Sequence, residues 1–297
     1  MSKRYDAGKI ITAMVTPFNK DLKIDYDACE ELVKHLVHTG SDSILIAGTT
    51  GESPTLSLDE KIELLSTVKR ACANKAKVVF GAGSNSTEKA VKLAKLAEKE
   101  GADAILSVVP YYNKPSQEGI IAHFSAVAES VKLPIILYNI PGRTGINMAV
   151  DTVKYLAEKY ENIVGLKQSY FDLDVISELK LACPEDFTIY SGDDSLTLPM
   201  MALGVEGVIS VASHLWANEI KTMIHNFENG NYLFAKNMHL KLYPIFKKLF
   251  MAPNPVPVKA ALKKAGLIES YVRLPLVELN DAQKSKLYLA IDKFNEE

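Results

Sequence analysis

A lysine at the end of an apolar run is the first residue here that could carry out chemistry. The segment Asn162–Ser169 reads Asn-Ile-Val-Gly-Leu-Lys-Gln-Ser, which is typical of a short buried strand with Lys167 at its far end. Two interpretations are open. Lys167 could lie just past the strand with its ammonium group in water, because charged groups are seldom buried without a partner. Alternatively, it could be a desolvated amine that attacks a carbonyl carbon and forms a Schiff base.

Polar and aromatic residues also follow earlier apolar runs. In Gly48–Glu52, the backbone amides and the hydroxyls of Thr49 and Thr50 could hold a carboxylate. The same residues could instead form an ordinary turn. Further along, Tyr111 and Tyr112 lie in a loop bounded by prolines, where tyrosines are commonly packing residues.

Two later strand ends carry further candidates. Tyr138 could move protons, and Arg143 in the loop after it could bind a carboxylate. Their alternatives are a core tyrosine and a solvated loop arginine. In Ser191–Asp194, the two aspartates are expected to cap the next helix rather than to take part in catalysis.

Several other chemistries lack support in the sequence. The histidines and cysteines form no HExxH or CxxC motif, so no metal site is expected. Gly81 and Gly83 precede a helical run, but Ser86 occupies the position of the third glycine of a dinucleotide fingerprint. The loop at residues 210–214 has no glycine with which to cradle a phosphate. We therefore expect neither a cofactor nor a metal.

Strand-like and helix-like runs alternate along most of the chain. A helical run follows each strand, which favours a parallel sheet covered by helices. Eight such units favour a closed (β/α)₈ (TIM) barrel, although an open doubly wound sheet remains possible. The predicted strands are Ile10–Thr16, Ser43–Gly48, Lys77–Gly83, Ala104–Pro110, Pro134–Asn139, Ile163–Lys167, Thr188–Ser191 and Gly207–Val211.

The alternation stops after Gly230. We therefore predict a catalytic barrel over residues 1–230 and a small C-terminal helical extension over residues 231–297, whose alternative is a set of capping helices without a role of their own. The predicted helices of this extension are Asn231–Phe250, Lys259–Ala265 and Asp281–Phe294.

Composition restricts the possible partners. The 297 residues carry a net charge of −2 without a basic block, so a nucleic-acid partner is not expected. No run reaches the roughly 18 consecutive apolar residues of a membrane helix, and the N-terminus lacks the apolar core of a secretory signal. Three scattered cysteines are typical of reduced thiols, which predicts a cytoplasmic protein.

Taken together, the candidate loops resemble those of a known enzyme family. The motifs that carry the resemblance span nearly the whole chain: Gly48–Glu52, Pro110–Asn113, Leu137–Asn139, Arg143–Gly145, Gly165–Lys167, Ser191–Asp194, Gly207–Ser213 and Asn254–Lys259. In order and spacing they resemble the pyruvate-dependent class I aldolase family, which includes the N-acetylneuraminate lyases. The resemblance implies a (β/α)₈ barrel with a helical C-terminal part, assembled as a homotetramer of two tight dimers.

The resemblance also implies roles for individual residues. Lys167 would form a Schiff base with pyruvate, and Tyr138 would be the general acid/base. Thr50 and Tyr112 would complete a proton relay with Tyr138, and Tyr112 would reach in from the neighbouring subunit across the tight dimer. Thr49 and Thr50 would bind the carboxylate of pyruvate.

The second substrate implied by the resemblance is L-aspartate 4-semialdehyde, whose carboxylate Arg143 would bind. Gly192 and Ile209 would offer backbone groups near the bound ketoacid. The product would be 4-hydroxy-tetrahydrodipicolinate, which enters diaminopimelate and lysine biosynthesis. Two alternatives remain: a lyase for N-acetylneuraminate or a 2-keto-3-deoxy sugar acid, and a barrel that binds a ketoacid without catalysis. Arg143 favours an aldehyde that bears a carboxylate over a polyol.

The sequence departs from the family pattern in two places. Gln168 and Ser169 stand where Glu-Ala is common, which affects the surroundings of the lysine and not the nucleophile itself. Members that lysine inhibits carry histidines at the positions of Leu58 and Lys61, whereas Ser53, Asn85 and Tyr111 are kept. We therefore expect weak or absent inhibition by lysine.

Overall fold

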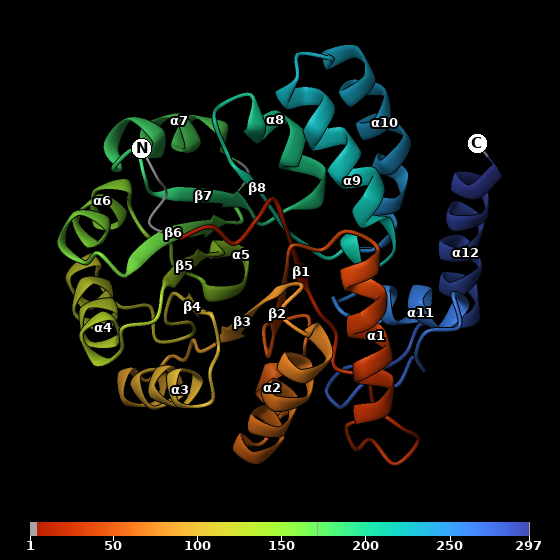
Figure 1. Ribbon diagram of the computed structural model, residues 1–297, viewed down its shortest axis with the longest axis horizontal. Coiled ribbons are helices and arrows are strands. Elements are labelled where there is room, and N and C mark those ends of the chain that lie inside the picture. The colour runs from red at the N-terminus through yellow and green to blue at the C-terminus, as the bar shows by residue number, and fades with distance from the viewer. Residues whose placement is uncertain (1–4, 171, 297) are drawn as a thin grey trace. The chain divides into compact units, whose positions relative to one another are not determined.

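The chain forms a closed barrel of parallel strands. The structure is a computed structural model that describes residues 5–170 and 172–296 (Figure 1). Strands β1 to β8 follow one another around the barrel in sequence order, and helices intervene between them. The predicted (β/α)₈ barrel is thereby confirmed. Its strands are β1 (Ile10–Ala13), β2 (Ser43–Ile46), β3 (Lys77–Gly81), β4 (Ala104–Val108), β5 (Ile135–Asn139), β6 (Ile163–Gln168), β7 (Thr188–Ser191) and β8 (Gly207–Ser210).

Helices follow every strand, and further helices occupy the C-terminal part. The helices are α1 (Tyr26–His38), α2 (Leu58–Cys72), α3 (Thr87–Lys99), α4 (Gln117–Ser130), α5 (Pro141–Thr144), α6 (Val150–Lys159), α7 (Leu173–Ala182), α8 (Thr197–Met201), α9 (Ser213–Glu228), α10 (Tyr232–Lys248), α11 (Val256–Lys264) and α12 (Asp281–Glu296). Two short 3₁₀ turns, η1 (Ser53–Thr55) and η2 (Asp194–Leu196), precede α2 and α8.

Backbone contacts divide the chain into two compact units. The first unit comprises residues 5–8 together with Val79–Ile209, and the second comprises Lys9–Val78 together with residues 210–296. One boundary falls just before β1, and the other two fall within β3 and β8. The division into a barrel of residues 1–230 and an extension of residues 231–297 stays a prediction.

Within the first unit, β5, β6 and β7 are buried along their whole lengths. Parallel strands covered on both faces show this pattern, and it explains their continuous apolar runs. Ser86 and Ser116 begin the neighbouring helices α3 and α4, where each hydroxyl accepts a backbone N–H three residues later. Such caps satisfy donors that the first helical turn leaves open and contribute about 1 kcal/mol each.

Within the second unit, Ser57 and Glu60 form the predicted capping box at the start of α2. The C-terminal helices pack against one another: α10 lies beside α9 and α12, and α11 contacts α12 (Figure 1). The three predicted C-terminal helices are therefore confirmed. α11 begins at Val256, earlier than the predicted Lys259, because Pro257 is tolerated in a first helical turn, whose N–H groups have no helical partner.

Several predicted strands extend too far at their carboxyl ends. The predicted strand Ile10–Thr16 ends at Ala13, although the residues after it remain buried. There the backbone N–H of Val15 donates to Nε2 of His214 at 3.0 Å, so a side chain replaces a strand as its partner. β2 ends before Ala47, which adopts a left-handed backbone with φ of 51°. Buried loops continue the apolar pattern of the strands, and the pattern alone cannot separate the two.

Candidate active site

Lys167 lies inside the barrel wall and not beyond it. It belongs to β6, and 7% of its surface is exposed. Its register partner on β5 is Tyr138, and Nζ of Lys167 lies 4.4 Å from the centroid of the Tyr138 ring. The side chain of Lys167 therefore packs against the face of this ring within the barrel wall. The geometry therefore favours the desolvated amine over a lysine whose head reaches water.

Because Gly192 has no side chain, the side chain of Lys167 can pack beside it. A Cβ atom added at Gly192 would lie 3.0 Å from Cε of Lys167 and 1.8 Å from Oγ of Ser169. Any larger residue would displace one or both of these side chains. The N–H of Gly192 donates to the backbone oxygen of Gln168 at 2.8 Å, so this amide is already used within the chain.

A bridge of side-chain amides joins the carboxyl ends of β5 and β6. Nδ2 of Asn139 donates to Oε1 of its register partner Gln168 at 3.1 Å and to Oδ1 of Asn147 at 2.7 Å. Oδ1 of Asn139 accepts the N–H of Met148 at 3.1 Å. Since Gln168 directly follows Lys167, this bridge holds the strand end that carries the lysine. In this bridge the side chain of Gln168 only accepts, so the Glu that is common here in the family that the sequence resembles could accept the same hydrogen bond.

Arg143 and Tyr112 lie on the loops after β5 and β4, and both side chains are exposed. Arg143 belongs to the short helix α5, and within the described part of the chain its guanidinium forms no ion pair. Tyr112 is 88% exposed and has a left-handed backbone with φ of 74°, while its N–H donates to the oxygen of Thr144 at 3.3 Å. The packing interpretation of Tyr112 is thus not supported within this chain.

The two remaining candidates of the first unit behave differently. Ile209 lies in β8 with 1% of its surface exposed, so its side chain is a core residue and only its backbone could contact a ligand. The carboxylate of Asp193 accepts the N–H of Ser195 at 2.8 Å and caps η2. The expectation that this aspartate caps a helix is confirmed.

Thr49 and Thr50 belong to the second unit, in the Gly48–Glu52 loop that follows β2. Thr49 is exposed, whereas Thr50 is 4% exposed and its Oγ1 accepts a hydrogen bond from Nδ2 of Asn254 at 2.9 Å. Gly51 leaves little space for a side chain, since an added Cβ would lie 3.2 Å from backbone atoms of Met14 and Ala47. The loop is therefore a tightly fitted turn that presents one buried hydroxyl and one exposed hydroxyl.

The same loop ends in a buried ion pair. Oε1 of Glu52 accepts a hydrogen bond from Nζ of Lys259 at 2.5 Å, with the two side chains 1% and 0% exposed. Burial lowers the pKa of Lys259 to about 8, and the carboxylate of Glu52 acts in the opposite direction. Oε2 of Glu52 accepts the backbone N–H of Arg273 at 3.0 Å.

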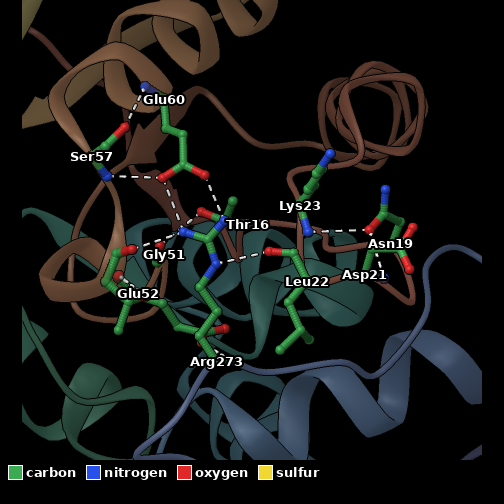
Figure 2. A network of polar contacts seen from close by, with 11 residues as sticks. Thr16, Asn19, Asp21, Leu22, Lys23, Gly51, Glu52, Ser57, Glu60 and Arg273 are labelled. Carbon is green, nitrogen blue, oxygen red and sulfur yellow. Dashed lines mark hydrogen bonds and ion pairs between the residues drawn. The ribbon is translucent and has the colours of Figure 1, made fainter.

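Arg273 extends this network to the start of α2. Figure 2 shows its guanidinium pointing toward the carboxylate of Glu60 and the backbone oxygen of Leu22. Its two nitrogens reach Glu60 at 2.5 and 2.9 Å, a fork that lowers the pKa of the Glu60 carboxyl. Asn254, Lys259 and Arg273 were given no role by the sequence. The only signal was that two of them delimit the motif Asn254–Lys259.

Two further findings concern the described residues. Within them no cluster of histidine, cysteine, aspartate and glutamate has the grouping that a metal ion needs. None of the described helices combines the length and the apolar character required to cross a membrane.

The closed barrel and the buried amine on β6 agree with the resemblance to lyases of the class I aldolase type. A model of the dihydrodipicolinate synthetase family matches residues 6–293. The 4-hydroxy-tetrahydrodipicolinate synthase of Desulforamulus reducens is 52% identical over 273 residues, 92% of each chain. Dihydrodipicolinate synthase of Cyanidioschyzon merolae with lysine bound superposes with a TM-score of 0.96 at 47% identity, covering 97% of this chain and 98% of that one. Dihydrodipicolinate synthase of Bacillus anthracis superposes with a TM-score of 0.95 at 44% identity, covering 97% of this chain and 98% of that one. The chain therefore belongs to the dihydrodipicolinate synthetase family.

Proposed function

We propose that this chain condenses pyruvate with L-aspartate 4-semialdehyde to give 4-hydroxy-tetrahydrodipicolinate, the first committed step of diaminopimelate and lysine biosynthesis. The observation that carries the proposal is the buried amine of Lys167, 4.4 Å from the ring centroid of Tyr138. Family membership and the name of the Desulforamulus reducens relative support the same reaction. The reaction takes place in the cytoplasm, a location that the scattered cysteines favour.

The proposed mechanism begins with the amine of Lys167, whose lone pair adds to the carbonyl carbon of pyruvate. The adduct takes up a proton from water, and the former carbonyl oxygen leaves as water to give a protonated imine. The imine withdraws electrons, so the methyl group loses a proton to the relay of Tyr138, Thr50 and Tyr112 and becomes an enamine. The enamine carbon attacks the aldehyde carbon, and the aldehyde oxygen is protonated. The amine of the semialdehyde then attacks the imine carbon, displaces Lys167 and closes the ring.

The remaining residues bind and orient the substrates. Thr49 and Thr50 hold the carboxylate of pyruvate, and the backbone groups of Gly192 and Ile209 contact the bound ketoacid. Holding the reacting carbon atoms in this way converts an encounter in solution into a reaction within one complex.

Tyr112 is assigned to a neighbouring subunit of a homotetramer built from two tight dimers. An exposed tyrosine on a left-handed backbone is unusual, because this conformation costs a residue other than glycine of the order of 1 kcal/mol. Such a cost persists where the surrounding structure holds it, and here the N–H of Tyr112 is bonded to Thr144. This supports a phenol presented outward to a second copy of the chain.

A coupled assay with pyruvate and the semialdehyde tests the reaction, run beside borohydride trapping of the pyruvate adduct. We expect turnover, and a mass spectrum that places the adduct on Lys167. Faster cleavage of N-acetylneuraminate than condensation with the semialdehyde would favour the sugar-acid lyase. Absence of both adduct and turnover would favour a barrel that binds a ketoacid without catalysis.

Arg143 provides the test of the second substrate. Replacing it by alanine is expected to raise the KM for the semialdehyde roughly 10- to 100-fold, because hydrogen bonds to charged groups contribute about 1.5–3 kcal/mol. The pyruvate adduct should form at the normal rate. Arg143→Lys should recover part of the loss, since it keeps the charge without the planar fork. Arg70, an exposed arginine paired with Glu30, gives the matched control Arg70→Ala. Equal losses for both substrates in Arg143→Ala would contradict the assignment.

Inhibition by lysine is expected to be weak or absent. Leu58, which is 38% exposed, and Lys61 stand where lysine-inhibited members carry histidines. An aliphatic group and a cation offer no acceptor for the ammonium groups of lysine. Assays of condensation with added lysine check this, and half-inhibition below 1 mM, on the order of typical metabolite affinities, would contradict it. The Cyanidioschyzon merolae structure, which has lysine bound, makes that enzyme the natural comparison.

A further inference from the structure

The last quarter of the chain holds the Gly48–Glu52 loop from two sides. On one side, Nδ2 of Asn254 donates to Oγ1 of Thr50 at 2.9 Å, and both residues are buried. On the other side, the carboxylate of Glu52 is held by Nζ of Lys259 and by the backbone N–H of Arg273. Figure 2 shows Glu52 and Arg273 together in this network. The C-terminal segment thus fixes the loop at two points within three residues.

The direction of the Asn254 hydrogen bond determines what the hydroxyl of Thr50 can do. A hydroxyl has one proton to donate and two lone pairs, whereas an amide nitrogen can only donate. Because Thr50 accepts from Asn254, its own proton cannot be given to that amide group. Oδ1 of Asn254 has no hydrogen-bond partner within the described residues, so the hydrogen bond to Thr50 is the one that orients its amide group.

The backbone around this hydroxyl has little freedom to move. An added Cβ at Gly51 would be 3.2 Å from two backbone atoms, and Glu52 has a left-handed backbone with φ of 55°. The ion pair of Glu52 with Lys259 keeps this conformation in place on the C-terminal side of the loop. With the backbone fixed, rotation about the side-chain bonds of Thr50 is the main remaining freedom, and the bond from Asn254 restricts it.

We propose that Asn254 is a positioning residue that fixes the hydroxyl of Thr50 as a hydrogen-bond donor toward the bound ketoacid and the proton relay. This inference rests on the proposed function, in which Thr50 contacts pyruvate and carries a proton. It also assigns a role to the C-terminal extension of residues 231–297. The alternative interpretation of this extension was a set of capping helices without a role of their own. Asn254 itself acts through Thr50 and not on the substrate.

A double-mutant cycle between Asn254 and Thr50 tests the inference. The readouts are kcat/KM for pyruvate and the rate of borohydride trapping of the pyruvate adduct, which remains measurable when turnover is slow. Asn254→Ala should lower both by about five- to tenfold, the scale of one hydrogen bond. In a Thr50→Val background the same substitution should change either rate by less than about twofold, because the hydroxyl through which it acts is gone.

Asn254→Asp tests the direction of the hydrogen bond without changing the size of the side chain. A carboxylate can only accept, so it would take the proton of Thr50 and turn the hydroxyl into an acceptor toward the site. We expect this variant to lose more activity than Asn254→Ala. Asn229, an exposed asparagine of the same compact unit, gives the control Asn229→Ala, which should match the wild type.

The outcomes separate this inference from the proposed function. Equal losses on replacing Asn254 in the wild-type and Thr50→Val backgrounds would mean a general structural effect and would overturn it. An aspartate variant as active as the wild type would overturn it as well, even if the alanine variant failed to fold. Wild-type protein that forms no pyruvate adduct would instead overturn the proposed function.

Discussion

Lys167→Ala is expected to lose condensation activity by about a thousandfold or more, the scale at which removal of a covalent nucleophile acts. The variant retains the loops that carry the other candidate residues. Within the described structure, however, no other amine lies against the ring of Tyr138. Because the substituted residue is one buried side chain on a fully buried strand, folding should be checked by thermal unfolding. The measurement is the coupled assay, with mass spectrometry after borohydride treatment in the presence of pyruvate.

Tyr138→Phe is the matched comparison for this result. It keeps the ring beside Nζ of Lys167 and removes only the phenolic hydroxyl. We expect turnover to fall about 10²- to 10⁴-fold, as for the loss of a general acid/base, while the trapped adduct still forms. The two variants therefore separate the nucleophile from the proton carrier. Adduct formation that persists in Lys167→Ala at another lysine would contradict the assignment of Lys167.

Lys259→Met is expected to reduce the free energy of unfolding by about 3–5 kcal/mol, because it leaves the carboxylate of Glu52 buried without its cation. Nζ of Lys259 also lies 4.1 Å from the centroid of the Phe18 ring and donates to the oxygen of Tyr271, and both contacts are lost. The free energy of unfolding of a domain is about 5–15 kcal/mol in total, so this loss is a large fraction of the stability. Urea unfolding of the purified variant measures it.

Two further variants test whether burial causes this effect. Lys263 lies on the same helix, α11, and pairs with Glu269 at 2.6 Å, but both side chains are about half exposed. Lys263→Met should therefore cost less than about 1 kcal/mol. Glu52→Gln combined with Lys259→Met removes both charges and should recover part of the loss. Equal destabilisation by Lys259→Met and Lys263→Met would contradict a special role for the buried pair.

The sequence was sufficient to predict the features that depend on local pattern. All eight strands and the three C-terminal helices are present, and Ser57 and Glu60 form the expected capping box. These features follow from apolar periodicity and from residue types with a fixed meaning at helix starts. The burial of Lys167 was one of two open interpretations, because a strand pattern does not show what packs against the end of the strand.

The contacts that hold the candidate site could not be predicted in the same way. Asn254 and Thr50 are 204 positions apart, and Glu52 and Lys259 are 207 apart. The bridge from Asn139 to Gln168 joins two strands whose register the pattern does not specify. Such pairs depend on the tertiary arrangement, and an asparagine or glutamine in a sequence carries no sign of which distant group it will contact.

The second compact unit joins the beginning of the chain to its end, and this has a consequence for biosynthesis. Thr12 in β1 bonds the hydroxyl of Ser213 at 2.7 Å, and the N–H of Val15 needs the imidazole of His214. On a ribosome, these early residues emerge long before their partners exist. The contacts of β1 and of the residues after it with α9 therefore form only after almost all of the polypeptide has been made. We expect nascent chains arrested before α9 to depend on chaperones, since contacts so distant in sequence form slowly.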